Sequence, residues 1–318
     1  MKITICGAGG FIGENLVRHL SNDKKNEITA IFSRKNFIYR VDDNVKCIRA
    51  NLLDPKHVSE YIQDCDLLLQ MAATTSGSNV IVNSPYVHVT DNAIMNSLLL
   101  RETVNKKIGH FIFPSCSVMY PSSLEPQDEN IDFNNPITDK YFGVGNTKLY
   151  IEKMCKFYST VSNTKFTVIR HTNVYGPYDK FDPAVSHVFA ALMRKIVEAK
   201  DSIEIWGDGE EGRDLLYIDD LIDFIEKAVQ KQENKYELFN VGSGELVKIK
   251  NLATTIMNVL DKQLNIEYNS SKPTIPVNIT LDYSKAKSLV AWEPKTSLAT
   301  GIEKTHNWYK ENIKDKCQ

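Results

Sequence analysis

The chain has 318 residues, of which 42% are hydrophobic and 25% charged, so it can bury the core of one large domain or two. Its 38 Lys and Arg residues nearly balance 40 Asp and Glu residues without any basic block, which argues against nucleic acid and an anionic membrane surface as partners. No apolar run approaches the roughly 18 residues of a transmembrane helix, and no signal peptide is recognisable, so we expect a cytoplasmic protein. The six cysteines are scattered, which predicts neither a metal site nor a disulfide framework.

A glycine-rich turn follows the first predicted strand, an apolar run over residues 3–6. Gly7, Gly10 and Gly13 have the spacing G-x-x-G-x-x-G, and residues 14–20 continue with helical spacing. In such a turn, backbone N–H groups can face a pyrophosphate while the helix packs closely on the strand. The order strand, glycine turn and helix predicts a dinucleotide-binding unit. The expected cofactor ligands here are Gly7, Gly10, Phe11, Ile12 and Gly13.

The residues after the second predicted strand, 27–32, bear on the choice of cofactor. The end of this strand faces the adenosine ribose, where an acidic residue binds the 2′-hydroxyl of NAD and an arginine binds the 2′-phosphate of NADP. The sequence has no acidic residue there and continues instead with Ser33, Arg34 and Lys35. This run favours NADP, with Ser33 and Arg34 as ligands, although NAD is possible; the alternative is a solvent-exposed basic turn.

Strand and helix patterns keep alternating through the first half of the chain. The pattern predicts further strands over 45–49, 66–71 and 110–113, a helix from Asp54-Pro55 and a long helix over 85–104. The long helix carries Ile94, Leu98 and Leu99 on one apolar stripe. Ala72 and Ala73 follow the 66–71 strand and leave room for a cofactor. The alternation predicts an α/β fold with a doubly wound parallel Rossmann sheet and a ligand at the carboxyl ends of the strands.

Several blocks occur in the order found in the extended short-chain dehydrogenase/reductases, and the chain resembles the nucleotide-sugar epimerases and dehydratases of that family. After the glycine motif these blocks are 115–121, 146–153, 170–177, 186–188, 206–209 and 213–220. Within the family, residues 175–183, 186–188 and 271–273 most resemble the GDP-L-fucose synthases. The resemblance covers nearly the whole chain. It implies hydride transfer at a carbon of a nucleoside-diphosphate sugar, with GDP as the expected nucleotide, and we expect a homodimer.

In this family a Ser or Thr and a Tyr bind the reacting sugar oxygen, and a Lys one helical turn after the Tyr lowers its pKa and holds the nicotinamide ribose. Lys148 matches that lysine. The tyrosine is missing, because Val144 stands four residues before Lys148 and valine cannot transfer a proton. The nearest phenol, Tyr141, would lie about two turns or roughly 10 Å away along a helix, too far to couple directly unless the chain before Gly143 folds back.

The loop after the fifth strand departs from the family pattern as well. Cys116 stands at the position of the family Ser or Thr and is either an acid/base group or a small buried residue. Val118 replaces the cysteine that GDP-L-fucose synthases use as an acid/base, whereas His187 matches the histidine partner of that cysteine. The expected catalytic residues are Lys148, Tyr141, Cys116, Ser117 and His187.

From Asn173 onward the regular alternation ends, which predicts a smaller α/β substrate-binding domain. We expect a Rossmann domain over 1–172 and 215–243, and a nucleotide-sugar-binding domain over 173–214 and 244–318. A helix that contains Arg194 is predicted over 183–198. Because the net charge of the chain is near zero, the diphosphate of a nucleotide sugar needs individual arginines, which can bind it through two hydrogen bonds each. The expected substrate ligands are Asn173, which the family also places at the nicotinamide, His187, Arg194, Arg213 and Trp206, the last of which either stacks on the base or fills the core.

Together these features predict an NAD(P)-dependent nucleotide-sugar oxidoreductase or epimerase that reduces a keto-sugar, with or without epimerisation. A 4,6-dehydratase is less favoured, because the 116–118 loop lacks the carboxylate that such eliminations use as an acid. Val144 supports a rival of another class, a cofactor-binding partner or regulatory protein that has lost catalysis.

Overall fold

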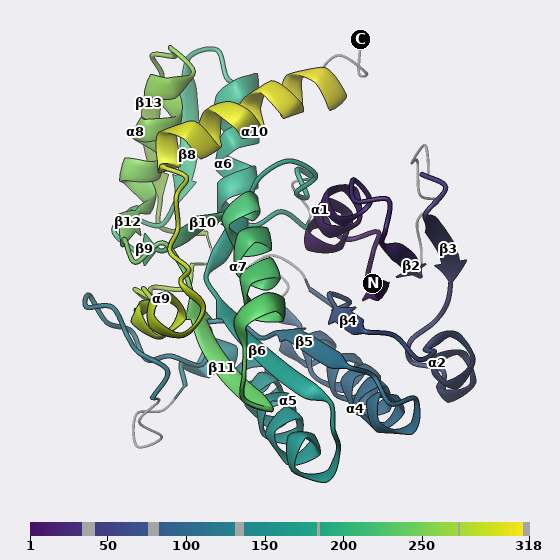
Figure 1. Ribbon diagram of the computed structural model, residues 1–318. Helices are drawn as coiled ribbons and strands as arrows, with labels where there is room; N and C mark the ends of the chain where they lie inside the picture. The colour runs from purple at the N-terminus through teal and green to yellow at the C-terminus, as the bar shows by residue number, and fades with distance from the viewer. Residues whose placement is uncertain (34–41, 76–82, 131–136, 183–184, 273, 314–318) are drawn as a thin grey trace.

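The computed structural model describes residues 1–33, 42–75, 83–130, 137–182, 185–272 and 274–313 (Figure 1). Its centre is a seven-stranded parallel sheet with the strand order β11-β6-β5-β4-β1-β2-β3. The strands are β1 (Lys2–Cys6), β2 (Glu27–Phe32), β3 (Val45–Arg49), β4 (Leu67–Gln70), β5 (His110–Pro114), β6 (Lys165–His171) and β11 (Tyr236–Val241). The predicted doubly wound Rossmann sheet is confirmed.

Helices cover both faces of this sheet, which explains why its central strands β1, β4 and β5 are almost completely buried. Ile3 and Ile5 point into one core, which they share with α1 (Phe11–Leu20) and α7 (Ile218–Lys231). Cys6 points to the opposite face, into the core formed with α2 (Pro55–Tyr61), α4 (Thr90–Asn105) and α5 (Phe142–Val161). Asp54 caps α2 by accepting a hydrogen bond from the Lys56 backbone N–H at 2.8 Å, as its sequence position predicts.

A smaller α/β region lies over one end of the sheet (Figure 1). Its short sheets pair β7 with β10, β9 with β12, and β8 with β13. The strands are β7 (Asn173–Tyr175), β8 (Ser202–Trp206), β9 (Gly212–Arg213), β10 (Leu215–Tyr217), β12 (Val247–Lys248) and β13 (Asn265–Asn269). The helices are α6 (Val188–Glu198), α8 (Ile249–Val259), α9 (Ser284–Val290) and α10 (Leu298–Asn312), and two short 3₁₀ helices, η1 (Pro85–His88) and η2 (Asp139–Tyr141), belong to the first half of the chain.

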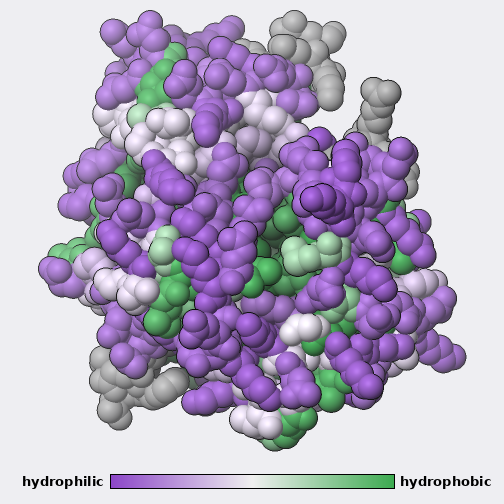
Figure 2. Space-filling model, in the orientation of Figure 1, coloured by the Kyte–Doolittle hydropathy of each residue, from purple (hydrophilic) through white to green (hydrophobic). Residues whose placement is uncertain are grey.

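The surface in the view of Figure 2 is mostly hydrophilic, with small hydrophobic areas between the polar outer faces of the helices. Of the helices that the structure describes, none is long and apolar enough to cross a membrane.

Two predicted helices differ from the structure. The 85–104 helix is divided into η1 and α4, and Ile94 lies on an exposed side of α4, with 43% of its surface accessible, whereas Leu99 is fully buried. The inward face of α4 also carries Asn92 and Asn96, polar residues whose side chains bind neighbouring backbone. The helix expected from residue 183 begins only at Val188.

A buried ion pair joins β6, the strand next to the edge strand β11, to α5. Arg170 of β6 and Glu152 of α5 are 5% and 4% exposed, and their closest contact, Nη2 to Oε2, is 2.7 Å. Nε of Arg170 donates to both carboxylate oxygens at 3.1 and 3.2 Å, and its Nη1 donates to the Tyr120 hydroxyl at 3.0 Å. Ser115, just after β5, donates to Oε1 of Glu152 at 2.5 Å. The pair therefore connects β6, α5 and the loop after β5.

Removal of one partner of this ion pair is expected to destabilise the fold strongly. The Glu152→Ala variant leaves the Arg170 guanidinium buried without its counter-charge, which costs about 3–5 kcal/mol. Urea unfolding followed by circular dichroism measures the loss. Lys287→Met, which breaks an exposed ion pair with Glu293, is the control and leaves the midpoint unchanged. Equal midpoints for Glu152→Ala and wild type would contradict the assignment.

Candidate active site

The glycine turn at the end of β1 has the geometry of a pyrophosphate cradle. Gly7 has a φ of +73°, and a Cβ on it would lie 2.5 Å from the Ala72 backbone nitrogen. A Cβ on Gly13 would lie 2.2 Å from the Gly7 carbonyl oxygen, so only glycine lets α1 approach the turn this closely. Phe11 and Ile12 form the first turn of α1, and their side chains pack against the core. The backbone N–H groups of this first turn are the groups that bind an anion at a helix N-terminus. These residues fit a dinucleotide.

The β4 loop lies directly beside this turn and is held by buried amides. The Gln70 side chain donates to the Ala72 carbonyl and to Oδ1 of Asn96, both at 3.0 Å. Asn92 bonds to both the N–H and the carbonyl of Thr74, each at 3.0 Å. Ala72 and Ala73 thus lie in a loop that α4 keeps in place. Sequence reasoning missed the three amides, although polar residues inside otherwise apolar strand and helix patterns were a signal.

The ribose end of the expected cofactor site lies at β2 and β3. Ser33 is exposed at the end of β2, while Arg34 lies outside the described residues. A cation that the sequence analysis passed over, Arg49 at the end of β3, donates from Nε to the Ser33 carbonyl at 3.2 Å.

Lys148 and Cys116 come together at the end of β5. Lys148, half-buried on α5, donates from Nζ to the Pro114 carbonyl at 2.9 Å and lies 4.6 Å from the centre of the Phe113 ring. Burial lowers the pKa of Lys148, against the opposing influence of Cys116 and Glu152. Burial raises the pKa of the half-buried Cys116 thiol, and the Lys148 charge acts in the opposite direction. Ser117, beside Cys116, is buried, and its carbonyl accepts the Tyr120 N–H at 3.1 Å.

Tyr141 lies next to the same loop. It ends η2 and is the N-cap residue of α5, so about two α-helical turns separate Tyr141 from Lys148, as the sequence predicts. Tyr141 and Cys116 pack against one apolar cluster, formed by Met119, Tyr120, Leu149, Ile275, Val277, Ile279 and Leu281. Burial raises the pKa of Tyr141, and the nearby Arg213 charge opposes that rise. The half-buried Val144 occupies the first turn of α5.

Two histidines line the other side of this region. His187 directly precedes α6; burial lowers its pKa, and the nearby charges of Lys180 and His88 lower it further. His171, which the sequence analysis did not single out, ends β6. Burial lowers its pKa to about 4, and the charges of Lys148 and His187 act in the same direction. We call this region at the carboxyl ends of β5 and β6, with Lys148, Cys116 and His171 at its centre, the candidate cleft.

The expected substrate ligands already have protein partners. Asn173 donates from Nδ2 to the Asp214 carbonyl at 3.3 Å, and Arg194 forms an ion pair with Glu198 at 2.8 Å. Arg213 donates to three backbone carbonyls, those of Gly212, Val277 and Ile275.

Trp206 is half-buried at the end of β8 rather than a filler of the core. Its Nε1 donates to Glu204 at 3.0 Å. The ammonium groups of Lys195 and Lys272 lie 5.5 and 5.9 Å from its ring centre, so the indole is flanked by two cations that sequence reasoning did not select. Within the described ranges, no group of three or more His, Cys, Asp and Glu side chains could hold a metal ion.

A parallel sheet with a glycine turn at its carboxyl edge and a lysine-containing cleft beside it defines a dinucleotide-binding α/β protein. Residues 3–242 match the family model described as "NAD dependent epimerase/dehydratase family", and the chain belongs to that family. Its resemblance to the extended short-chain dehydrogenase/reductases is therefore confirmed.

Individual relatives cover the whole chain. GDP-L-colitose synthase of Yersinia pseudotuberculosis is 28% identical over 317 residues, 97% of this chain and 98% of that protein. GDP-L-fucose synthase of Sinorhizobium fredii is 27% identical over 321 residues, 99% and 97% of the two chains. Among solved structures, UDP-glucuronic acid 4-epimerase from Bacillus cereus in complex with UDP-glucuronic acid and NAD has a TM-score of 0.85 at 26% identity, covering 98% and 99%.

The loop from Gly176 to Lys180 connects the parts that border the cleft. Asn15 of α1 donates to the Pro177 carbonyl at 2.9 Å, and Lys180 donates to Oγ1 of Thr75, in the β4 loop, at 3.2 Å. Tyr178, with a φ of +69°, lies between Arg18 and Trp308, 4.4 and 4.7 Å from its ring centre.

Asp179, in the middle of this loop, is 8% exposed. Its Oδ1 accepts the Lys180 N–H at 2.6 Å, and its buried Oδ2 has no hydrogen-bond partner among the residues that the structure describes. Burial raises the pKa of this carboxyl from 3.8 to about 6.

This carboxyl is expected to make stability fall as the pH rises. The folded protein holds it neutral up to about pH 6, whereas the unfolded chain ionises near 3.8, so its favourable contribution is present below pH 3.8 and lost through pH 6. Asp179→Asn removes a penalty of roughly 3 kcal/mol at pH 8 and little at pH 4. Urea unfolding at pH 4, 6 and 8 checks this, with the exposed Asp201→Asn as control. A gain that does not vary with pH would count against the buried ionisation.

Proposed function

We propose that the protein is an NADP-dependent oxidoreductase or epimerase of the cytoplasm that acts on a GDP-linked keto-sugar, reducing it with or without epimerisation. The observation that supports the proposal is that Lys148 lies near Cys116 at the carboxyl end of β5, on the edge of the sheet that carries the glycine turn, and that Tyr141 packs against the same apolar cluster as Cys116. The names of full-length relatives, GDP-L-colitose and GDP-L-fucose synthases, support the GDP-sugar class.

When bound, NADP(H) supplies the hydride donor or acceptor. Gly7, Gly10 and Gly13, with the N–H groups of Phe11 and Ile12, would hold its pyrophosphate, and Lys148 its nicotinamide ribose. The Lys148 ammonium would stabilise negative charge that develops on the sugar oxygen. Tyr141 or Cys116 would give that oxygen its proton, since both side chains have raised pKa values and are protonated at neutral pH. Ser117 would help to orient the sugar.

The second half of the chain would bind the nucleotide. Trp206 offers an indole for the base, and Lys195 and Lys272 offer charges for the diphosphate. Asn173, His187, Arg194 and Arg213 remain proposed substrate ligands. We propose the corresponding division into domains. Residues 1–172 and 215–243 would bind the cofactor, and residues 173–214 and 244–318 would bind the nucleotide sugar.

We also propose a homodimer formed through α4 and α5. These two helices pack side by side, with the Ser97 and Tyr150 hydroxyls 3.3 Å apart. Their outer faces expose large apolar side chains, namely Ile94, Tyr150, Phe157 and Val161. Figure 2 shows hydrophobic side chains at the lower edge of the molecule, over these helices. A second copy would remove this apolar surface from water.

One observation favours a second candidate, a cofactor-binding partner protein without catalysis. Val144 occupies the position of the family tyrosine, and valine cannot transfer a proton. A 4,6-dehydratase stays the weaker enzymatic alternative, because the 116–118 loop has no carboxylate.

Binding and turnover distinguish these candidates. The purified protein is expected to bind NADPH and to oxidise it in the presence of a GDP-linked 4-keto-6-deoxy sugar, followed at 340 nm; UDP-, CDP- and dTDP-linked keto-sugars complete the panel. Lys148→Ala lowers turnover as well as cofactor affinity. NADPH binding without hydride transfer to any member of the panel would favour the partner protein.

The missing tyrosine leads to a sharper expectation. Either Tyr141→Phe or Cys116→Ala lowers kcat by at least about 100-fold, the usual loss when a general acid is removed. The matched controls Tyr86→Phe and Cys47→Ala, both exposed residues outside the candidate cleft, leave kcat unchanged. If neither cleft variant affects kcat, both are excluded as the proton donor.

The dimer is tested by charge insertion. Phe157→Glu places a carboxylate in the proposed apolar interface and converts the dimer to a monomer in sedimentation-velocity runs at micromolar concentration. Leu289→Glu, at a similarly exposed position on α9, is the control. A monomeric wild-type protein would refute the homodimer.

A further inference from the structure

The carboxyl ends of β2 and β3 are tied together by a guanidinium. Arg49 pairs in register with Phe32, and the Ala50 N–H continues the ladder by donating to the Phe32 carbonyl at 2.9 Å. The Arg49 side chain crosses toward β2 and donates from Nε to the carbonyl of Ser33, the residue that follows the strand, at 3.2 Å. The guanidinium therefore lies beside the carboxyl end of β2.

Arg49 retains binding capacity in this position. Its side chain is exposed, and no carboxylate of the described chain forms an ion pair with it, whereas Arg18, Arg101, Arg170 and Arg194 are all paired. The bond to Ser33 uses Nε only. The two Nη groups carry four further N–H donors, and a guanidinium can bind a phosphate dianion through two parallel hydrogen bonds.

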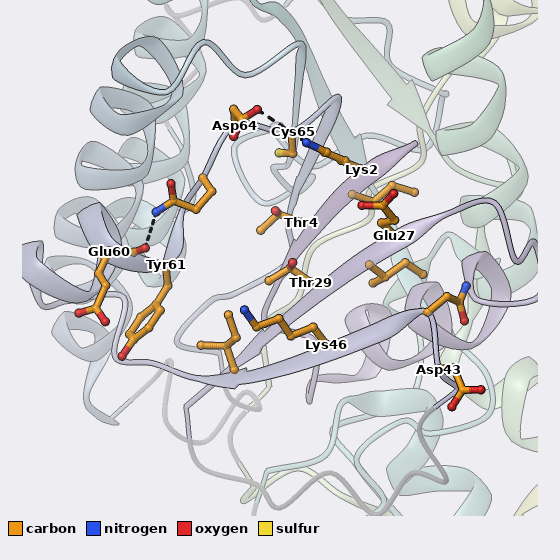
Figure 3. A pocket seen from close by; sticks show the side chains of 15 residues that line it. Lys2, Thr4, Glu27, Thr29, Asp43, Lys46, Glu60, Tyr61, Asp64 and Cys65 are labelled. Atoms are coloured by element: carbon orange, nitrogen blue, oxygen red, sulfur yellow. Dashed lines mark hydrogen bonds and ion pairs between the residues drawn. The ribbon is translucent and has the colours of Figure 1, made fainter.

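The other basic residue of β3 is oriented differently. Lys46 lies near the beginning of the strand and points into a cavity of about 380 Å³, where Figure 3 shows it close to Thr29. Acidic side chains border that cavity, among them Glu27, Asp43 and Glu60 (Figure 3). It opens near the amino-terminal ends of the strands, whereas ligands of such sheets bind at the carboxyl ends. Lys46 therefore offers a matched basic control on the same strand.

We propose that Arg49 binds the adenosine 2′-phosphate of the cofactor and is a specificity-determining residue for NADP(H) over NAD(H). This inference rests on the proposed function, because it takes the glycine turn to hold the pyrophosphate. In that arrangement the end of β2 faces the adenosine ribose. Arg49 supplies the bidentate cation from the neighbouring strand, and the exposed Ser33 hydroxyl lies on the same edge. From the sequence alone, only the residues that follow β2 are candidates for this contact.

Cofactor binding tests the proposal without any substrate. Quenching of tryptophan fluorescence gives dissociation constants for NADPH and NADH in wild type, Arg49→Leu, Arg49→Lys and the control Lys46→Met. Adenosine 2′,5′-bisphosphate and 5′-ADP serve as minimal probes of the 2′-phosphate. Arg49→Leu is expected to weaken NADPH and the 2′,5′-bisphosphate by about 10–100-fold, the value of one or two charge-assisted hydrogen bonds. NADH and 5′-ADP binding stay within about twofold, which shows that the variant is folded.

Three further results show whether Arg49 binds the 2′-phosphate: the affinity of Arg49→Lys, the salt dependence of NADPH binding and the ratio of the NADPH and NADH affinities. Arg49→Lys recovers part of the NADPH affinity, and added salt weakens NADPH in wild type more than in Arg49→Leu. An unchanged NADPH to NADH ratio in Arg49→Leu, or a wild-type preference for NADH, overturns the role of Arg49 while the proposed function stands. A wild-type protein that binds none of the four ligands overturns the cofactor site itself, and the proposed function with it.

Discussion

The buried ion pair between Arg170 and Glu152 is the constraint on which the cleft depends. Each partner is nearly inaccessible, so each charge is tolerable only beside the other, and the bidentate geometry fixes their relative orientation. Glu152 lies one helical turn after Lys148, on the same helix. Ser115, which bonds to Glu152, directly precedes Cys116. The pair thus determines where both the lysine and the thiol lie relative to β6.

The other border of the cleft is positioned by polar groups of a different kind. Buried amides of Gln70, Asn92 and Asn96 hold the β4 loop against the glycine turn, and the Gly176–Lys180 loop reaches from α1 to the same place. Because amides are neutral, they can be buried at a smaller cost in hydration than the ion pair. The β4 loop beside the expected cofactor site is therefore held by neutral groups. The positive charges near that site belong to Lys148 and Lys180.

The sequence predicted well what depends on local patterns. The glycine turn, the alternation of strands and helices and the cap at Asp54 follow from spacing and residue type within short stretches, and each is present. Contacts between distant segments were not predictable in this way. Nothing near His171 indicates that the end of β6 brings it beside Lys148, and Arg49 was only a strand residue until β2 and β3 were paired. The prediction that Ile94 lies on the buried stripe of its helix was wrong for a related reason. α4 has apolar residues on two sides, and the sequence pattern alone does not show which side packs against the sheet.

The valine at position 144 changes which groups of the candidate site could exchange a proton with a bound sugar. A tyrosine coupled to Lys148 would have a lowered pKa and could both accept and donate a proton, as reversible oxidation of an alcohol requires. Tyr141 and Cys116 are different, because burial raises both pKa values and keeps the phenol and the thiol protonated. A protonated group beside the sugar oxygen can give a proton to a carbonyl that receives a hydride, but it is poorly suited to take one from a hydroxyl. In the proposed function, Tyr141 and Cys116 would therefore act as proton donors to a sugar oxygen whose carbon receives a hydride.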